Sequence, residues 1–180
     1  KSNHVYSEEM EHDACGVGLV ASTEGLKSRK VVEYGIDALK AVWHRGAIDA
    51  DGKTGDGAGI HIEIPKDFFE EKIEVTGHKH DNSELCVGMI FLPRNDYSAQ
   101  EQCRTIVESE LTKRNFSIYG WRQVPVDPSV LGEKAEQTRP EITQVLFTYN
   151  DKKVVNKSLE QKLYETRRAV SYTHLTLPTN

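Results

Sequence analysis

One unbroken apolar run, residues 85–92, constrains the fold of this chain more than any other feature of its sequence. The run reads Leu-Cys-Val-Gly-Met-Ile-Phe-Leu and stops at Pro93, which cannot donate a hydrogen bond to a sheet. A continuous apolar run of this length, bounded by proline, is typical of a strand that is buried on both faces. The run therefore predicts a strand inside a layered fold.

Four further segments are predicted to be strands. Residues 15–21 form a short run rich in Val and Leu, and residues 60–64 alternate strictly between apolar and polar side chains before Pro65. Residues 116–124 and 142–149 have strand character and are separated by a loop that contains several prolines. The chain thus offers enough strands for two small sheets.

Three main helices are predicted between these strands. Ser28 can cap the first helix, which stops near residue 45. Capping boxes, in which a serine and a Glu or Gln three residues later bond each other's backbone amides, predict helices that begin at Ser98 and at Ser158. A short helix is predicted around residues 68–69. The apolar residues of the first helix recur at helical spacing and predict a core face: Val32, Ile36, Leu39 and Trp43.

The order of these elements predicts the fold class. Strands and helices are interspersed without a regular alternation, which favours an α+β layered sandwich over a doubly wound parallel sheet. Residues 1–14 are polar and have no apolar period, so they are interpreted as a leader to the domain. Residues 171–180 contain no charged side chain after a strongly charged helix, and we interpret them as a non-native tail.

Charge and hydropathy exclude several functions. The 180 residues carry 23 Lys and Arg against 28 Asp and Glu, a net charge of −5, with no basic stripe, so we expect no nucleic-acid partner. No stretch approaches the ~18 apolar residues of a membrane span, and the first residues lack a secretory signal. We therefore expect a cytoplasmic protein with no membrane contact. No group of side chains has the spacing of a metal site, so no metal is expected.

Two nucleotide-binding patterns are nearly matched and are rejected. Residues 16–21 fit the dinucleotide fingerprint, but they lie inside a strand-like run and do not open a helix. Residues 52–54 resemble the end of a phosphate loop, yet Ala47 stands where that motif requires its first glycine. Neither pattern indicates a nucleotide site.

The three cysteines have different predicted environments. They contain no CxxC pair and their number is odd, so they are interpreted as free thiols. Cys86 lies in the apolar run and Cys103 on the apolar stripe of a helix, which predicts two core thiols. Cys15 stands at the head of a predicted strand, and cleavage of the Ala14–Cys15 bond would place an α-amino group beside its thiol. Nucleophile and base would then come from one residue, although a structural role for Cys15 stays open.

Five motifs together resemble a known family. They are EHDACGVGLVA at residues 11–21, HRGA at 44–47, TGDGAGI at 54–60, Ile64-Pro65 and Phe68-Phe69. They resemble the start of the glutaminase domain of the glutamate synthase large chain, a class II glutamine amidotransferase of the N-terminal-nucleophile hydrolase type. The Cys-Gly and His-Arg-Gly motifs alone would fit the wider class, including members that act on phosphoribosyl diphosphate or fructose phosphate. The segment at residues 54–60 narrows the resemblance to glutamate synthase.

The resemblance implies a fold, a reaction and site residues. The fold would be an αββα sandwich, incomplete in this chain, with residues 1–14 as propeptide and residues 15–170 as the N-terminal part of the domain. Cys15 would attack glutamine through a thioester and release ammonia for the amination of 2-oxoglutarate, and Arg45 would lie near the glutamine pocket. FMN and an iron–sulfur cluster, held by the remaining glutamate synthase domains, are implied for the whole enzyme and none for this chain.

Two alternatives accompany this interpretation. The chain could be part of another class II amidotransferase, or a non-catalytic α+β segment in which Cys15 is never unmasked. The family's later Asn-Gly pair, which forms its oxyanion hole, has no match in these residues. Because such donors contribute a large part of the rate, we expect negligible glutaminase activity from the 180 residues alone.

Overall fold

The structure of the chain, a computed structural model, describes residues 16–80, 83–151 and 156–171. Cys15 and the predicted leader lie outside the described residues, as does the predicted tail beyond its first residue. Every helix within the described ranges is too short or too polar to cross a bilayer.

The chain folds into two compact units. Unit 1 consists of Lys1–Ile62 and Pro128–Gln137, and unit 2 of Glu63–Asp127 and Thr138–Asn180. All the hydrophobic side chains that are buried in the described residues belong to unit 2. The two units therefore differ in what stabilises them, and each is described by itself.

Unit 2 is built on a three-stranded antiparallel sheet with the order β1-β3-β2. Its strands are β1 (Leu85–Leu92), β2 (Phe116–Gln123) and β3 (Glu141–Tyr149), so β1 is the predicted strand of residues 85–92 without any shift. Phe147 of the central strand pairs with Cys86 on one side and with Ile118 on the other. The two later strands also match their predicted positions within one residue at each end.

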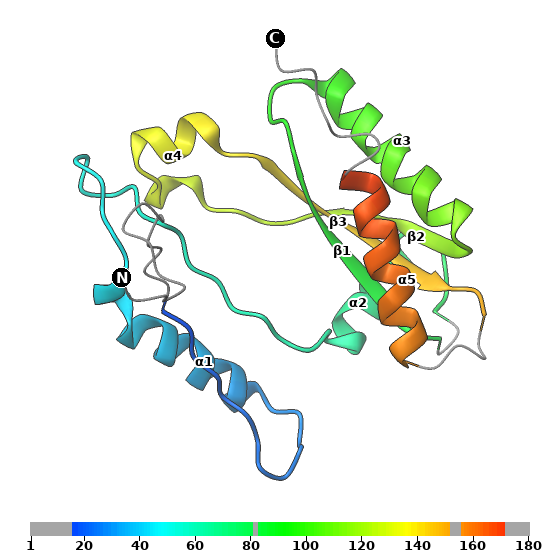
Figure 1. Cartoon of the computed structure of the whole chain (residues 1–180), viewed down its shortest axis with the longest axis horizontal. Coiled ribbons are helices and arrows are strands. Elements are labelled where there is room, and N and C mark those ends of the chain that lie inside the picture. Colours follow the sequence, from blue (N-terminus) through cyan, green and yellow to red (C-terminus); the bar gives the residue numbers. More distant parts are fainter. Residues whose placement is uncertain (1–15, 81–82, 152–155, 172–180) are drawn as a thin grey trace, which may run out of the picture. The chain divides into compact units, whose positions relative to one another are not determined.

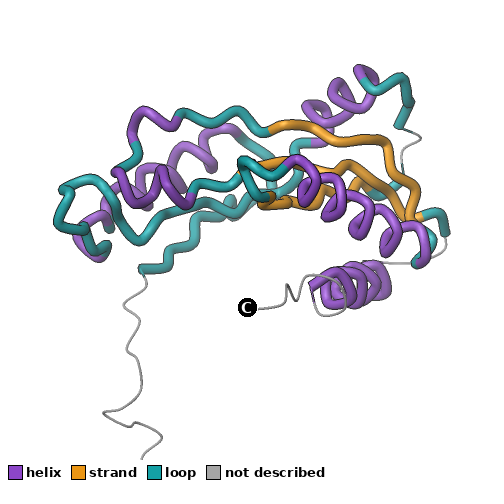
Figure 2. Tube along the Cα trace, turned by 90° about the horizontal axis from the view of Figure 1, so that it is seen from above, coloured by secondary structure: helices purple, strands orange, loops and turns teal. Residues whose placement is uncertain are grey.

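Three helices cover the two faces of this sheet (Figure 1; Figure 2, strands in orange). They are α2 (Lys66–Val75), α3 (Tyr97–Lys113) and α5 (Asn156–Ala169). On one face, α3 and α5 form a core with the sheet that consists of Cys86, Val107, Leu111, Phe116, Val145, Phe147 and Leu159. On the other face, α2 packs against the sheet through a second core of Phe69, Ile73, Leu85, Tyr119 and Leu146.

The second core covers one part of β1 and leaves another part open. Side chains two residues apart in a strand point to the same face, so Met89 and Phe91 share the face of Leu85 and Val87. Leu85 is buried in the second core and Val87 packs against it, whereas Met89 is 50% exposed and Phe91 is 64% exposed. The prediction of a strand buried on both faces is therefore correct for the beginning of β1 and wrong for its end.

A β-bulge brings α2 close to the sheet. The register of β2 against β3 shifts between Ile118 and Gly120, and Gly120 has a φ of 152°. A Cβ atom at this position would stand 2.9 Å from the Cγ2 atom of Thr76, the C-cap residue of α2. Glycine at position 120 thus permits both the bulged backbone and the close approach of the helix end.

Unit 1 contains short helices and irregular segments. Its elements are α1 (Arg29–Ala41), η1 (Trp43–Arg45), η2 (Pro128–Val130) and α4 (Glu133–Thr138), whose last residue belongs to unit 2. The cap predicted at Ser28 is confirmed, since its hydroxyl oxygen accepts a hydrogen bond from the Lys30 amide at 3.2 Å. No residue of α1 is fully buried. Of its predicted core face, Val32, Ile36 and Leu39 are half-buried, and the prediction is wrong for Trp43, which lies in η1 and is 73% exposed.

The strands predicted at residues 15–21 and 60–64 are not formed in their described parts. The described residues 16–21 and 60–64 are irregular, and their apolar side chains are exposed except for Val20 and Ile64, which are half-buried. A strand needs hydrogen bonds from a neighbouring strand, and no described segment pairs with either of these. The α+β class is confirmed by the mixed helices and the antiparallel sheet, while the second sheet of the predicted sandwich is absent from the described residues.

The starts of two helices also differ from prediction. The N-cap of α3 is Asp96, whose carboxylate accepts a hydrogen bond from the Ala99 amide at 2.9 Å, so Ser98 lies inside the first turn. Helix α5 begins at Asn156, two residues before the predicted Ser158. Both serines fit the capping-box pattern, but a cap forms where the chain enters the helix, and each of these helices begins before its serine.

Candidate functional site

The motifs Ile64-Pro65 and Phe68-Phe69 lie in unit 2, where Phe69 is part of the second core. Two other family motifs lie in unit 1. The first, residues 44–47, begins within η1, the 3-10 turn that follows α1. A hydrogen bond from the Gly46 amide to the Trp43 carbonyl oxygen at 3.1 Å closes this turn. The second motif, residues 54–60, follows after an acidic loop. The end of the first helix therefore leads directly into the segment that carries both motifs.

Direct hydrogen bonds join the two motifs. The Ala47 amide donates to the Oδ2 atom of Asp56 at 2.8 Å, and Ile48 forms an antiparallel bridge with Gly55. The Asp49 amide donates to the Thr54 carbonyl oxygen at 2.7 Å. The residues between the motifs thus form a closed loop, residues 47–56, whose ends are paired.

The side chain of Asp51 organises the inside of this loop. Its Oδ1 atom accepts hydrogen bonds from the amides of Lys53 at 2.9 Å and Thr54 at 2.7 Å, and its Oδ2 atom accepts from the Thr54 hydroxyl at 2.5 Å. The hydrogen bond from the Thr54 side chain, followed by those from the two amides, lowers the pKa of Asp51 from 3.8 to about 2. The carboxylate is therefore ionised and engaged at neutral pH, and the loop is held by polar contacts.

A segment far along the chain supports the same loop. Gly132 is buried, and a Cβ atom there would overlap the side chains of Thr54 and Asp51. Two residues later, the Lys134 ammonium group donates to the Oδ2 atom of Asp49 at 2.6 Å. The sequence predicts only a loop around Gly132. The contact of Gly132 with Thr54 and Asp51 could not be predicted, because no sequence motif links these residues.

The structure gives limited information on the two predicted site residues. Arg45 ends η1 and is separated from Ala47 by one residue, so its backbone adjoins the closed loop; its side chain is not described. Cys15 lies outside the described residues. The structure therefore assembles the two motifs downstream of Cys15 and leaves the roles of Cys15 and Arg45 as predictions.

The two described cysteines differ in burial. Cys86 is buried in the core beneath α5, and this burial, followed by the charges of Glu84 and Glu160, raises the pKa of its thiol to about 12. Such a thiol is protonated at neutral pH and is a poor nucleophile. Cys103 is half-buried on α3. The prediction of a core thiol is confirmed for Cys86, and Cys103 is less buried than predicted.

Metal-ligating side chains do not gather in the part of the chain that the structure describes: no group of three His, Cys, Asp or Glu residues there has the geometry of a metal site. The carboxylates of the closed loop accept hydrogen bonds from protein donors, Asp51 from Thr54 and Asp56 from Ala47. The loop is thus a structural turn built from acidic residues.

Comparison with known proteins connects these motifs to one family. The family model described as "Glutamine amidotransferases class-II" matches residues 15–179. The chain is 53% identical over 167 residues to the glutamate synthase [NADPH] large chain of Azospirillum brasilense, with 93% of this chain covered. It is 35% identical to the ferredoxin-dependent glutamate synthase of Pyropia yezoensis over 94% of the chain, and 37% identical to the glutamate synthase [NADH] of Saccharomyces cerevisiae over 82%.

The matched relatives are far longer than this chain. The alignments cover 11% of the bacterial protein, 11% of the algal protein and 7% of the yeast protein. The chain thus spans about a tenth of the length of the curated relatives it matches. The similarity concerns one domain of these proteins.

Proposed function

Because the chain belongs to the class II glutamine amidotransferases, we propose that it forms the first part of a glutaminase site in which Cys15 is the nucleophile. The observation that carries this proposal is the family match, which begins at residue 15 and leaves residues 1–14 outside. That boundary coincides with the cleavage site expected from the sequence. Residues 1–14 would then be a propeptide whose removal frees the α-amino group of Cys15.

The chemistry of an N-terminal cysteine fits amide hydrolysis. An α-amino group has a pKa of about 7.7–8.0 and a free thiol one of about 8.5, so the amine can accept the thiol proton near neutral pH. The thiolate sulfur attacks the side-chain carbonyl carbon of glutamine. The carbon–nitrogen bond then breaks, and the protonated amine donates its proton to the leaving ammonia. Water attacks the resulting thioester, which releases glutamate and restores the thiol.

Arg45 is proposed to contact the glutamine substrate. The support is its place in the chain, because it precedes the segment whose ends are fixed by the Ala47–Asp56 hydrogen bond and the Ile48–Gly55 bridge. A guanidinium held at such a fixed turn can bind a carboxylate with two parallel hydrogen bonds. The closed loop would then position Arg45 without touching the substrate itself.

The layered sandwich is proposed as the complete fold. Two observations support a second sheet: segments 16–21 and 60–64 have strand patterns without partners, and Met89 and Phe91 leave one face of β1 open. A further layer on this face would bury Met89 and Phe91, and partner strands would complete the hydrogen bonds of the two unpaired segments. The αββα arrangement of an N-terminal-nucleophile hydrolase would then be completed by residues outside the described ranges.

The whole protein is proposed to be a glutamate synthase, in which the released ammonia aminates 2-oxoglutarate in other domains. The sequence resemblance implies FMN and an iron–sulfur cluster for such an enzyme. A cluster is held by thiolates, whereas Cys86 of this chain is buried and the pKa of its thiol is raised to about 12. We place these cofactors in the remaining domains. The relatives are named for NADPH, NADH or ferredoxin, so any of the three is a candidate electron donor. A cytoplasmic location is part of the same proposal.

Glutamine hydrolysis by the full-length protein tests this function. Replacing Cys15 by alanine should lower kcat at least about a thousandfold, since the thiol that attacks the amide is lost. Cys103→Ala is the matched control, because it removes a thiol on α3 and should leave kcat within about twofold. Equal activity of the Cys15→Ala protein and the unchanged protein would overturn the proposal and favour a non-catalytic domain.

A further inference from the structure

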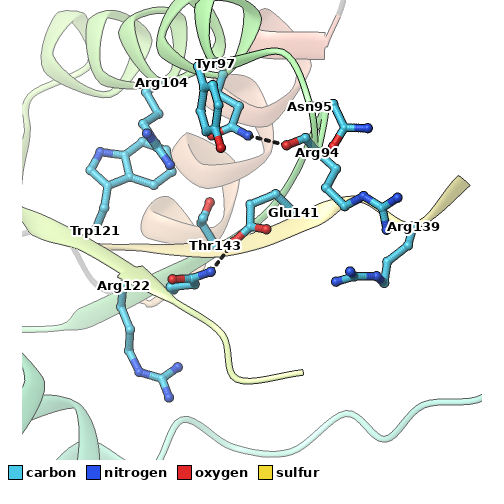
Figure 3. A pocket seen from close by; sticks show the side chains of 11 residues that line it. Arg94, Asn95, Tyr97, Arg104, Trp121, Arg122, Arg139, Glu141 and Thr143 are labelled. Atoms are coloured by element: carbon cyan, nitrogen blue, oxygen red, sulfur yellow. Dashed lines mark hydrogen bonds between the residues drawn. The ribbon is translucent and has the colours of Figure 1, made fainter. Parts of the chain in front are cut away.

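Unit 2 contains a cleft that the amidotransferase chemistry does not use. The cleft has a volume of about 590 Å³ and lies where the beginning of α3 faces the end of β2 and the beginning of β3 (Figure 3). This volume is in the range of sites that bind small molecules. None of its lining residues belongs to the family motifs on which the sequence resemblance rests.

The charge of the cleft is opposite to that of the chain. Four arginines line it, Arg94, Arg104, Arg122 and Arg139, against a single carboxylate, Glu141. The guanidinium of Arg122 points away from the cleft (Figure 3), because it lies over the ring of Phe68 and donates a hydrogen bond to the Oε1 atom of Gln144 at 2.6 Å. The chain as a whole has a net charge of −5. The Oε1 atom of Glu141 also accepts a hydrogen bond at 2.5 Å from Gln123, which engages part of the one negative group. A concentration of guanidinium groups in a concave surface favours an anion.

Two buried polar atoms of the cleft have no hydrogen-bond partner within the described structure. Thr143 is 3% exposed, and its Oγ1 atom makes no hydrogen bond. The Nε atom of Arg104 is likewise buried and unpaired. Figure 3 shows the Thr143 hydroxyl rising from β3 toward α3, on the cleft side of the strand. Buried donors without partners are rare in proteins, and both atoms here can donate to the same kind of group, an oxygen acceptor.

The guanidinium of Arg104 is held in place by its other contacts. Its Nη1 atom pairs with Glu101 one turn earlier on α3, and its plane lies over the ring of Trp121 at 5.7 Å from the centroid. Trp121 is itself fixed by a hydrogen bond from its Nε1 atom to the Oε1 atom of Glu108 at 2.6 Å. The orientation of Arg104 is thus set before any ligand arrives, which lowers the entropic cost of binding.

We propose that this cleft binds a small molecule through an oxyanion group, either a phosphate or a carboxylate. The Thr143 hydroxyl and the Nε atom of Arg104 donate to the anion, and the positive charges of Arg94 and Arg139 favour its approach. The proposal is independent of the glutaminase reaction, because its residues lie on α3, β2 and β3 of unit 2 and none of them is Cys15 or Arg45.

Titration of the 180-residue chain with inorganic phosphate, and separately with succinate, tests the proposal by NMR. Saturable shifts at the Trp121 indole and the Thr143 amide are expected with at least one of the two probes. Saturation with phosphate alone assigns a phosphate ligand, and saturation with succinate alone assigns a carboxylate. The absence of saturable shifts with both probes, or shifts spread evenly over the surface, would overturn the proposal.

Three variants separate the cleft from general charge effects. Thr143→Val keeps the shape of the side chain and removes a hydroxyl that has no partner, so the fold should persist while the Kd rises about tenfold. Arg104→Gln should raise the Kd by a similar factor or more. Arg167→Gln on α5 removes the same charge outside the cleft and should change the Kd by less than about twofold. Equal effects of the two arginine substitutions on the Kd, or no effect of Thr143→Val, would contradict the proposal. If a variant does not fold, the proposal is tested by whether the NMR shifts in the unchanged chain lie at Trp121 and Thr143.

Discussion

Different kinds of interaction stabilise the inside of each of the two units of this chain. Unit 2 contains all the fully buried hydrophobic side chains of the described residues, arranged on both faces of a three-stranded sheet. Unit 1 carries the family motifs at residues 44–47 and 54–60 and holds them with hydrogen bonds to Asp51 and Asp56. The buried core of unit 2 and the polar motif loop of unit 1 are thus stabilised by different contacts, so mutations and pH should affect them separately.

The largest expected effect concerns the core of unit 2. Ile73→Ala removes a side chain of α2 that is 0% exposed, which should lower the free energy of unfolding by about 2–5 kcal/mol. Val75→Ala, on the same helix, removes one that is 84% exposed and should cost less than about 0.5 kcal/mol. Chemical denaturation measures both values. Similar losses for the two variants would show that α2 is not packed on the sheet as described.

A smaller and more local effect is expected in unit 1. Gly132→Ala places a Cβ atom against Thr54 and Asp51, and overpacking of this kind costs about 1–3 kcal/mol. Gly59→Ala is the control, because a Cβ atom there meets nothing within 4 Å.

Amide hydrogen exchange can locate the effect of Gly132→Ala. Faster exchange is expected at Asp49 and Thr54, with the amides of β3 unchanged. If the sheet exchanged faster as well, the two units would not be independent, and the comparison between them would fail.

The smallest effect is a dependence of the closed loop on pH. The pKa of Asp51 is about 2 in the folded chain, below its ordinary value of 3.8, so its hydrogen bonds stabilise the loop fully above pH 3.8. This contribution is lost as the pH falls from about 4 to 2, because protonation then favours the unfolded loop. The amide resonances of Lys53 and Thr54 should titrate with a midpoint near 2. A midpoint near 3.8 would mean that the carboxylate does not accept these bonds.

The core of unit 2 could be predicted from sequence because its signals are local. The apolar run of β1 specifies both the strand and the buried side chains at its beginning, and the structure confirms its position. The exposed end of β1 could not be predicted, since burial of Met89 and Phe91 depends on a layer that the described residues do not supply.

The strand patterns of unit 1 show the opposite case. Residues 60–64 alternate as a strand should, yet they are irregular because no described segment pairs with them. The support that Gly132 gives to the motif loop was also missed, because it joins residues about eighty positions apart in the sequence, and spacing carries no information about such a contact. The candidate nucleophile came from the resemblance and from the chemistry of cysteine, and it lies outside the described residues.

The arginine cleft was missed for a related reason. Its residues come from the start of α3, the end of β2 and the start of β3, and they meet only when the sheet is assembled in the order β1-β3-β2. Each of these arginines, read alone, is an ordinary surface cation.

The mass of the mature N-terminus tests the central claim most directly. If Cys15 is the nucleophile of an amidotransferase, mass spectrometry of the active full-length protein should find residues 1–14 removed and Cys15 as the first residue. Treatment with an electrophilic analogue of glutamine should then add its mass to Cys15 and not to Cys86 or Cys103. An active protein that keeps the Ala14–Cys15 bond, or whose Cys15 stays unmodified while activity is lost, would contradict the account.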